Sequence, residues 1–220
     1  MYKARMLFKK EGRAKYISHL DNMQAIQRSI ARAGLPIWHT EGFNPHAYIS
    51  IGLPLSTGFS SEYELLDFNF LTEIVPENAV ADMNAALPSG LEVVDIYMAE
   101  RKAKEMKFSQ YQITYDFDNG KDSDFVKKVT DLFNQDEVVV VKRTKRSEKE
   151  VNIKEFIAKL EFCDIDENTA KATVITCAGD PNLSPEYITK AIEKYLPEIK
   201  FDGAYYHRTC VFDKDLVIFR

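Results

Sequence analysis

The densest group of side chains able to transfer a proton or bind an ion lies in the N-terminal part of the chain. Three of the four histidines, His19, His39 and His46, fall close together, with Glu41 and Glu62 nearby. Imidazole exchanges protons near neutral pH, and together with carboxylates it can bind a divalent metal. We therefore take His19, His46 and Glu62 as candidate catalytic residues and expect them to meet in one polar pocket.

A purely structural interpretation of the same residues stays open. His19 can support a helix start, His39 can lie on a strand, and His46 follows the turn-forming pair Asn44-Pro45. No pair among them has the i, i+4 helical spacing or the compact loop spacing of established metal sites. We predict no metal site.

Other polar residues could form a binding surface around this group. Arg28 and Arg32 step by four along a predicted helix, so they form either a solvated face or a contact for phosphate. The binding candidates close to the histidines are Ser18, His19, Asp21, Glu41, Asn44, His46 and Ser61.

A second basic segment lies further along the chain. Lys142, Arg143, Lys145 and Arg146 fall between two predicted ordered segments. Such a loop can follow a phosphate backbone, or it can simply be a soluble hairpin tip. The strand at Tyr205-Tyr206-His207-Arg208 is also ambiguous, because its aromatic rings can stack on bases or pack in a core.

Several classes of site are excluded by the sequence. It has no glycine-rich dinucleotide or phosphate loop, no His-Glu-x-x-His, and no closely spaced cysteine set for zinc or an iron–sulfur cluster. Cys163, Cys177 and Cys210 are expected to be reduced core thiols. We expect no cofactor of its own.

The elements that position these residues follow from hydrophobic spacing and turn residues. Ser18 is a predicted N-cap of a helix that Gly34 and Pro36 end. Strand-like pieces at 37–39, 47–51 and 64–70 look like one hairpin with elaborated loops. The other predicted segments of the first half are strands at 3–10 and 91–97 and helices at 18–33 and 76–87. With the hairpin counted as two strands, the order is strand, helix, strand, strand, helix, strand, which is the ferredoxin-like pattern.

The second half repeats this pattern. Its predicted strands are 108–117, 137–142, 160–165, 172–177, 205–212 and 216–219, and its predicted helices are 123–134 and 184–195. The charged segment 99–107 separates the halves. We predict an α+β fold of two tandem ferredoxin-like modules, residues 1–103 and 104–220.

Charge and hydropathy restrict the partners and the compartment. The net charge is −5, but the residues up to Leu55 are net positive, so a local basic face is compatible with an acidic protein. No stretch approaches the roughly 20 apolar residues that cross a bilayer. We expect a cytoplasmic protein that does not bind membranes.

A set of motifs resembles the radical-SAM-linked protein family, a domain of unknown function. In the first half these are Tyr16-Ile17-Ser18-His19-Leu20-Asp21, Arg32-Ala33-Gly34-Leu35-Pro36, Glu41-Gly42-Phe43-Asn44-Pro45-His46 and Ser60-Ser61-Glu62-Tyr63. In the second half Arg143-Thr144-Lys145 precedes Lys149-Glu150-Val151-Asn152-Ile153. The sequence departs from the family pattern at Ala47-Tyr48 and Asn152.

The resemblance implies a protein encoded beside, or fused to, a radical-SAM enzyme. The leading expectation is an accessory module that binds or presents RNA for modification by that partner. One alternative is a metal-independent endoribonuclease with an N-terminal catalytic histidine, an analogy at the level of fold. The other is a protein-interaction scaffold that does not bind RNA.

Overall fold

The structure is a computed structural model that describes residues 1–143 and 148–220, and it has a mixed α+β fold. The chain divides into two compact units. The first unit comprises Met1–Met106 with Val217–Arg220, and the second comprises Lys107–Leu216. The predicted boundary at 103/104 therefore falls slightly early, and the last four residues belong to the first unit.

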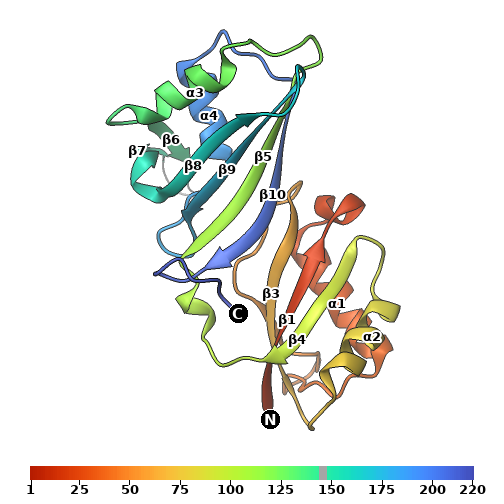
Figure 1. The fold of residues 1–220 in the computed structure, drawn as a ribbon. Coiled ribbons are helices and arrows are strands. Elements are labelled where there is room, and N and C mark those ends of the chain that lie inside the picture. Colours follow the sequence, from red (N-terminus) through yellow and green to blue (C-terminus); the bar gives the residue numbers. More distant parts are fainter. Residues whose placement is uncertain (144–147) are drawn as a thin grey trace. The chain divides into compact units, whose positions relative to one another are not determined.

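In the first unit two helices cover one face of an antiparallel sheet (Figure 1). The strand order is β4, β1, β3, β2. The elements along the chain are β1 (Tyr2–Lys10), α1 (His19–Ala33), β2 (Ile49–Ile51), β3 (Ser60–Phe70), α2 (Pro76–Ala86) and β4 (Leu91–Met98), with short 3-10 turns at Gly12–Tyr16 and Ala103–Glu105.

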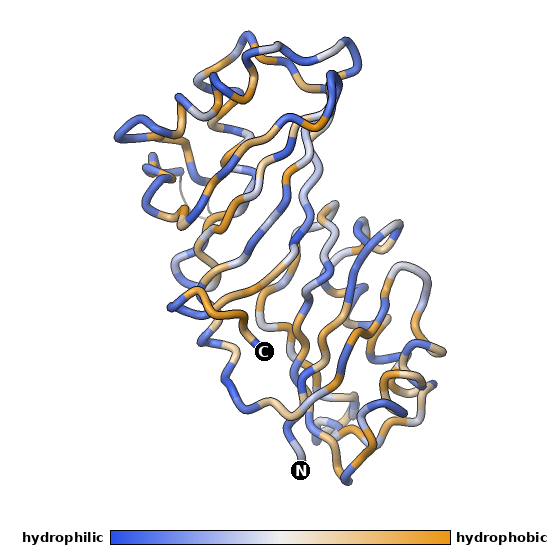
Figure 2. Tube along the Cα trace, in the orientation of Figure 1, coloured by the Kyte–Doolittle hydropathy of each residue, from blue (hydrophilic) through white to orange (hydrophobic). Residues whose placement is uncertain are grey.

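Alternation along the strands builds the core of this unit. Met6 and Phe8 of β1 point to the same side as Leu66 and Phe68 of β3, and they pack with Ile26 of α1. Hydrophobic and hydrophilic residues alternate along several strands (Figure 2). The residues between them on β1 and β3 lie on the face that the helices leave uncovered.

The second unit has the same order of main elements with an added hairpin. Its antiparallel sheet has the order β10, β5, β9, β8, and β6 pairs only with β7 among the described residues. The elements are β5 (Phe108–Asp116), α3 (Phe125–Asn134), β6 (Val139–Arg143), β7 (Glu148–Asn152), a 3-10 turn (Ile153–Phe156), β8 (Ile157–Asp164), β9 (Thr169–Cys177), α4 (Glu186–Tyr195) and β10 (Gly203–Phe212).

Some local predictions differ from the structure. The predicted strand at 216–219 is wrong, since only Ile218 has a bridge and Phe219 is held by its ring instead. The three thiols are free, but Cys163 is exposed on β8 and is no core residue. Within 1–143 and 148–220, no helix has both the length and the apolar character needed to span a bilayer.

Candidate nucleic-acid interface

His19 is the first residue of α1, and its surroundings are those of a helix cap. Ser18 Oγ accepts a hydrogen bond from the Asp21 backbone N–H at 3.1 Å and donates one to the Asp21 carboxylate at 2.7 Å. Ser18, His19 and Asp21 are all exposed. The cap thus accounts for two of the predicted binding residues, Ser18 and Asp21.

His46 lies in an exposed loop that fixes its imidazole locally. Its Nδ1 is 3.2 Å from Thr40 Oγ1 and 3.1 Å from the Asn44 carbonyl oxygen. His39 is fixed separately, with Nδ1 2.8 Å from the Ile37 carbonyl oxygen. Glu41 and Asn44 are exposed in the same loop as His46.

The expected single pocket around His19, His46 and Glu62 is not formed. Glu62 lies near the start of β3, whereas Ile49, just after the His46 loop, pairs with Phe68 near its end. Six residues of extended strand separate Glu62 from Phe68 by about 20 Å. Among the described residues no group of three or more His, Cys, Asp and Glu side chains is arranged to hold a metal.

A buried lysine, which was not predicted from the sequence, lies between the start of α1 and the start of β3. Lys10 is 2% exposed, pairs in register with Ser61, and donates from Nζ to the Ile17 carbonyl at 3.3 Å. Burial lowers the pKa of Lys10, and attraction to the buried Glu64 offsets only part of this effect. Ser61 is itself buried, and its Oγ accepts from the Tyr63 N–H.

The arginines and the basic loop that we predicted as binding residues lie in different surroundings. Arg32 donates to the carbonyl of Ala86, the last residue of α2, so it joins two helices. Arg28 is exposed on α1. Lys142 donates to the Asn182 carbonyl, while Lys145, Arg146 and the Arg143 side chain lie outside the described residues.

The tyrosine-rich strand divides between the two faces of its sheet. Tyr206 Oη donates to Thr189 Oγ1 at 2.8 Å on the helix-covered side, and buried Arg208 donates to Tyr111 Oη at 3.0 Å. Tyr205 is 51% exposed. Packing therefore explains Tyr206 and Arg208, and Tyr205 stays a candidate for stacking.

The uncovered face of the first unit holds a hollow of about 340 Å³. Strands β1, β2 and β3 form its floor, and the segment 99–103 forms one wall. Its polar lining includes Lys3, Tyr48, Ser50, Asp67, Asn69 and Lys102. None of His19, His46 and Glu62 lines this hollow.

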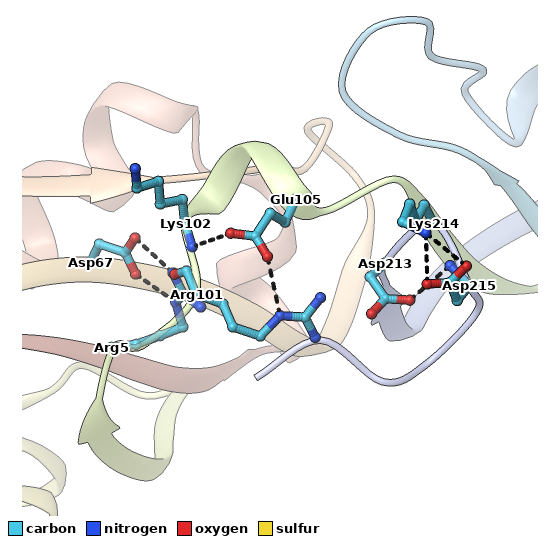
Figure 3. Close-up of polar contacts among 8 residues, drawn as sticks. All are labelled: Arg5, Asp67, Arg101, Lys102, Glu105, Asp213, Lys214 and Asp215. Carbon is cyan, nitrogen blue, oxygen red and sulfur yellow. Dashed lines mark hydrogen bonds and ion pairs between the residues drawn. The ribbon is translucent and has the colours of Figure 1, made fainter.

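A buried ion pair anchors the floor of the hollow. Arg5 Nε and Nη2 donate to the two carboxylate oxygens of Asp67 at 2.6 and 2.9 Å (Figure 3). The side chain of Arg5 is 1% exposed and that of Asp67 is 33% exposed. Burial lowers the pKa of Arg5, but the hydrogen bond and attraction from Asp67 outweigh it, so the Arg5 pKa is raised overall.

The wall of the hollow is tied to the same ion pair. Arg5 Nη2 donates to the Arg101 carbonyl at 2.9 Å, and Arg101 Nε approaches Glu105 at 3.4 Å (Figure 3). Two guanidinium groups lie close to the Phe219 ring: that of Arg5 is 4.7 Å from the ring centroid, and that of Arg101 is 4.5 Å from it. These contacts hold the segment before Lys102 against the sheet.

The rim of the hollow carries an exposed aromatic ring. Tyr48 is 46% exposed and meets Trp38 edge to face, with 5.5 Å between ring centroids. Lys3 pairs in register with Asn69, and Arg5 pairs with Asp67 two residues further along β1. A ring, an amide, a hydroxyl and two ammonium groups therefore surround one concave surface.

Sequence reasoning missed this surface because its residues are far apart in the chain. Lys3, Tyr48, Asn69 and Lys102 come from four different segments, and only strand register brings them together. The alternation of charged and apolar residues in β1 was the available signal. It places Lys3 and Arg5 on one face of the strand.

A family model described as an uncharacterized protein conserved in bacteria, DUF2344, matches residues 3–185. The chain belongs to this family. The DUF2344 match includes the whole hollow from Lys3 to Ala103 and extends through the second unit as far as Pro185, just before α4.

Solved structures add a likeness in fold to this DUF2344 protein. A chain in the crystal structure of a Cbf5-Nop10-Gar1 complex matches 96% of it with a TM-score of 0.52 and 10% sequence identity. The DUF2344 chain spans 50% of that chain, and at this identity the likeness shows the fold alone.

Two further comparisons carry no argument about function. An unknown protein from Galdieria sulphuraria matches 93% of this chain and 98% of its own length at 8% identity, with a TM-score of only 0.29. None of the curated proteins compared with the DUF2344 chain matches it.

Proposed function

We propose that this chain binds single-stranded RNA in the hollow of its first unit and presents that RNA to a radical-SAM enzyme for modification. The observation that carries the proposal is the exposed Tyr48 ring beside Lys3 and Lys102 on a helix-free sheet face. Proteins that bind single strands combine stacking rings with a cationic track for the backbone.

Stacking is the first contribution. The Tyr48 ring is exposed on one side and supported by Trp38 on another, so a base can stack on it without displacing core residues. Stacking of one base on an aromatic side chain contributes about 1–3 kcal/mol. Asn69 and Ser50 lie nearby and offer hydrogen bonds to a base edge or to a 2′-hydroxyl.

Charge is the second contribution. Asp67 is neutralised by Arg5, and Arg101 pairs with Glu105. The other charged residues of the lining are Lys3, Lys102 and Glu100. The hollow is therefore mildly cationic although the chain is acidic. Ammonium groups at such a surface bind phosphates in a salt-dependent way.

The topology also supports RNA binding. Each unit has an antiparallel sheet whose order corresponds to 4-1-3-2 in its βαββαβ sequence, once the β6–β7 hairpin is set aside. We take both units as ferredoxin-like modules on this basis. RNA-binding modules of this type bind bases on the sheet face opposite their helices.

The partner rests on the family resemblance alone. The motifs around Ser18-His19 and Asn44-Pro45-His46 resemble the radical-SAM-linked family, and they lie within the DUF2344 match. Affinity capture of the tagged chain from its source cells, followed by mass spectrometry, tests this part. Recovery of RNA without a radical-SAM protein would remove the partner from the proposal and leave RNA binding intact.

RNA binding itself is tested with Tyr48. We expect Tyr48→Ala to weaken binding of a fluorescent single-stranded RNA about tenfold or more, because it removes one stacking platform. Tyr48→Phe keeps the ring and should bind like the wild type. Tyr16→Ala is the matched control, since Tyr16 is 63% exposed in the same unit and does not line the hollow.

The same titrations separate the alternatives. Cleavage of the RNA in the presence of chelator, lost in His19→Ala or His46→Ala, would identify a metal-independent endoribonuclease instead. Absence of RNA binding, together with capture of a protein partner that salt does not disrupt, would identify a scaffold.

A further inference from the structure

The outer edge of β8 is an unpaired strand edge in the second unit. Strand β8 ends the order β10, β5, β9, β8, and in the described part of the chain no strand pairs with its other side (Figure 1). An open edge presents backbone N–H and C=O groups that can pair with another strand.

The side chains of β8 are complementary to themselves. Lys159 and Glu161 lie on one face, with side chains 55% and 62% exposed and their charges 3.1 Å apart. If a second copy of β8 lies antiparallel with Leu160 opposite Leu160, each Lys159 is directly opposite the second copy's Glu161. The ion pairs thus form twice, once on each side of the two-fold axis.

The other face of β8 carries its apolar side chains. The same register places Leu160 opposite its equivalent, whereas Phe162 lies opposite Ala158, which falls in the bulge between Ile157 and Lys159. A hollow of about 390 Å³ lies along this face between β8 and α3. Phe133 and Phe162 line it, with their ring centroids 5.7 Å apart.

Neighbouring registers do not fit. Centring the pair on Glu161 places two carboxylates opposite each other, and centring it on Phe162 places Glu161 opposite Cys163. A bulge between Ile157 and Lys159 limits the regular edge to the segment from Lys159 onward, where the Lys159 and Glu161 contacts lie. Charge and strand geometry therefore select one arrangement.

We propose that the outer edge of β8 is a homodimer interface, in which two copies of the chain pair antiparallel about Leu160. This goes beyond the proposed RNA binding and uses none of its residues. The partner is a second copy because the edge carries its own complementary charges at the spacing that a two-fold axis requires.

The test is a charge exchange measured by sedimentation equilibrium over a dilution series of the full chain. The wild type should show a concentration-dependent dimer. Lys159→Glu and Glu161→Lys should each weaken it about tenfold or more, because two attractive cross-strand pairs become repulsive. The double variant Lys159→Glu/Glu161→Lys restores both pairs in reverse and should recover the dimer.

A control variant carries the same charge change away from the β8 edge. Glu73→Lys has the same charge change as Glu161→Lys at an exposed loop position of the first unit and should leave the dimer unchanged. Circular dichroism on each variant confirms that the fold is kept. A wild-type monomer at all concentrations, or a double variant no better than the single ones, would overturn the proposal.

Discussion

Arg5 is a charged side chain in a position that water does not reach. The free-energy cost of burying its charge is offset by two hydrogen bonds to Asp67 and one to the Arg101 carbonyl. The Phe219 ring, which lies against the guanidinium, contributes as well. A buried pair of this kind stabilises little overall, but loss of one partner is expensive because the other charge stays uncompensated. Asp67 therefore matters to stability more than a surface carboxylate does.

We expect Asp67→Asn to lower the free energy of unfolding by about 3 kcal/mol, because it leaves the Arg5 guanidinium buried without a counter-charge. Urea unfolding followed by circular dichroism measures this change. Asp131→Asn is the matched control: it breaks an exposed i, i+4 pair with Lys127, which solvent screens, and should have a much smaller effect. Equal effects of the two substitutions would contradict the buried-pair account.

Tyr206 gives a prediction about alkaline pH. Burial raises the pKa of Tyr206 to about 12, which the hydrogen bond to Thr189 only partly offsets. The unfolded phenol, with its ordinary pKa near 10, loses its proton first. The stability due to neutral Tyr206 is thus fully present below pH 10 and is lost as pH rises from 10 towards 12.

Substitution of this tyrosine isolates its contribution. Tyr206→Phe should cost about 1 kcal/mol at pH 8, because Thr189 loses a hydrogen-bond donor. It should also make the fall in stability between pH 10 and pH 11.5 shallower. Urea midpoints across this pH range provide the measurement, and an unchanged slope would show that Tyr206 does not titrate as described.

At the scale of elements, α1 shows how local sequence determines a helix. Ser18 caps its N-terminus, and Gly34 closes its C-terminus in the left-handed conformation, with φ of 65°. Both ends were predicted from the same residues. The helix therefore owes its limits to cap chemistry, independently of any binding role of His19.

We expect Ser18→Ala to destabilise the protein by about 1 kcal/mol through loss of the Asp21 cap, without changing affinity for RNA. Ser18→Thr retains both the hydroxyl acceptor for the Asp21 N–H and the hydroxyl donor to the Asp21 carboxylate, and it should recover most of that stability. Thermal unfolding and RNA titration of both variants check the two statements. Weaker RNA binding by both Ser18→Ala and Ser18→Thr would show that Ser18 contacts the ligand.

The sequence predicted elements better than contacts between elements. Helices with caps and strands with regular alternation, such as 18–33 and 108–117, were located almost to the residue. The apolar run of four residues that ends at Phe219 predicts a strand, because such a run looks the same whether it pairs with another strand or packs one ring against two guanidinium groups. The side chain of Asn152 also makes a contact that the sequence pattern does not reveal, because it accepts a hydrogen bond from the Val138 N–H.

The candidate site was predicted less well, for a physical reason. His19, His46 and Glu62 are close in sequence, but β3 separates Glu62 from the end of the sheet where the His46 loop lies. Tyr48, Lys3 and Asn69 are distant in sequence, but register places them on one face. Proximity in a sheet is determined by pairing between strands, and a single sequence specifies that pairing weakly.

At the scale of the whole molecule, the chain is acidic but its N-terminal region is basic. An acidic surface repels nucleic acid in general, so the RNA binding that we propose requires a local cationic site. Lys3 and Lys102 on the lining of the hollow in the first unit are the groups that we propose for it. RNA affinity should therefore be modest and should depend on salt through a small number of phosphate contacts.

The salt dependence of RNA binding tests this central claim most directly. For a single strand, the slope of log K against log salt changes by about 0.7 for each phosphate contact. Lys3→Ala/Lys102→Ala should make the wild-type slope shallower by about 1.4. The control Lys190→Ala/Lys200→Ala, on exposed lysines of the second unit, should leave it unchanged. Equal slopes for the wild type and the Lys3→Ala/Lys102→Ala variant would contradict RNA binding in this hollow.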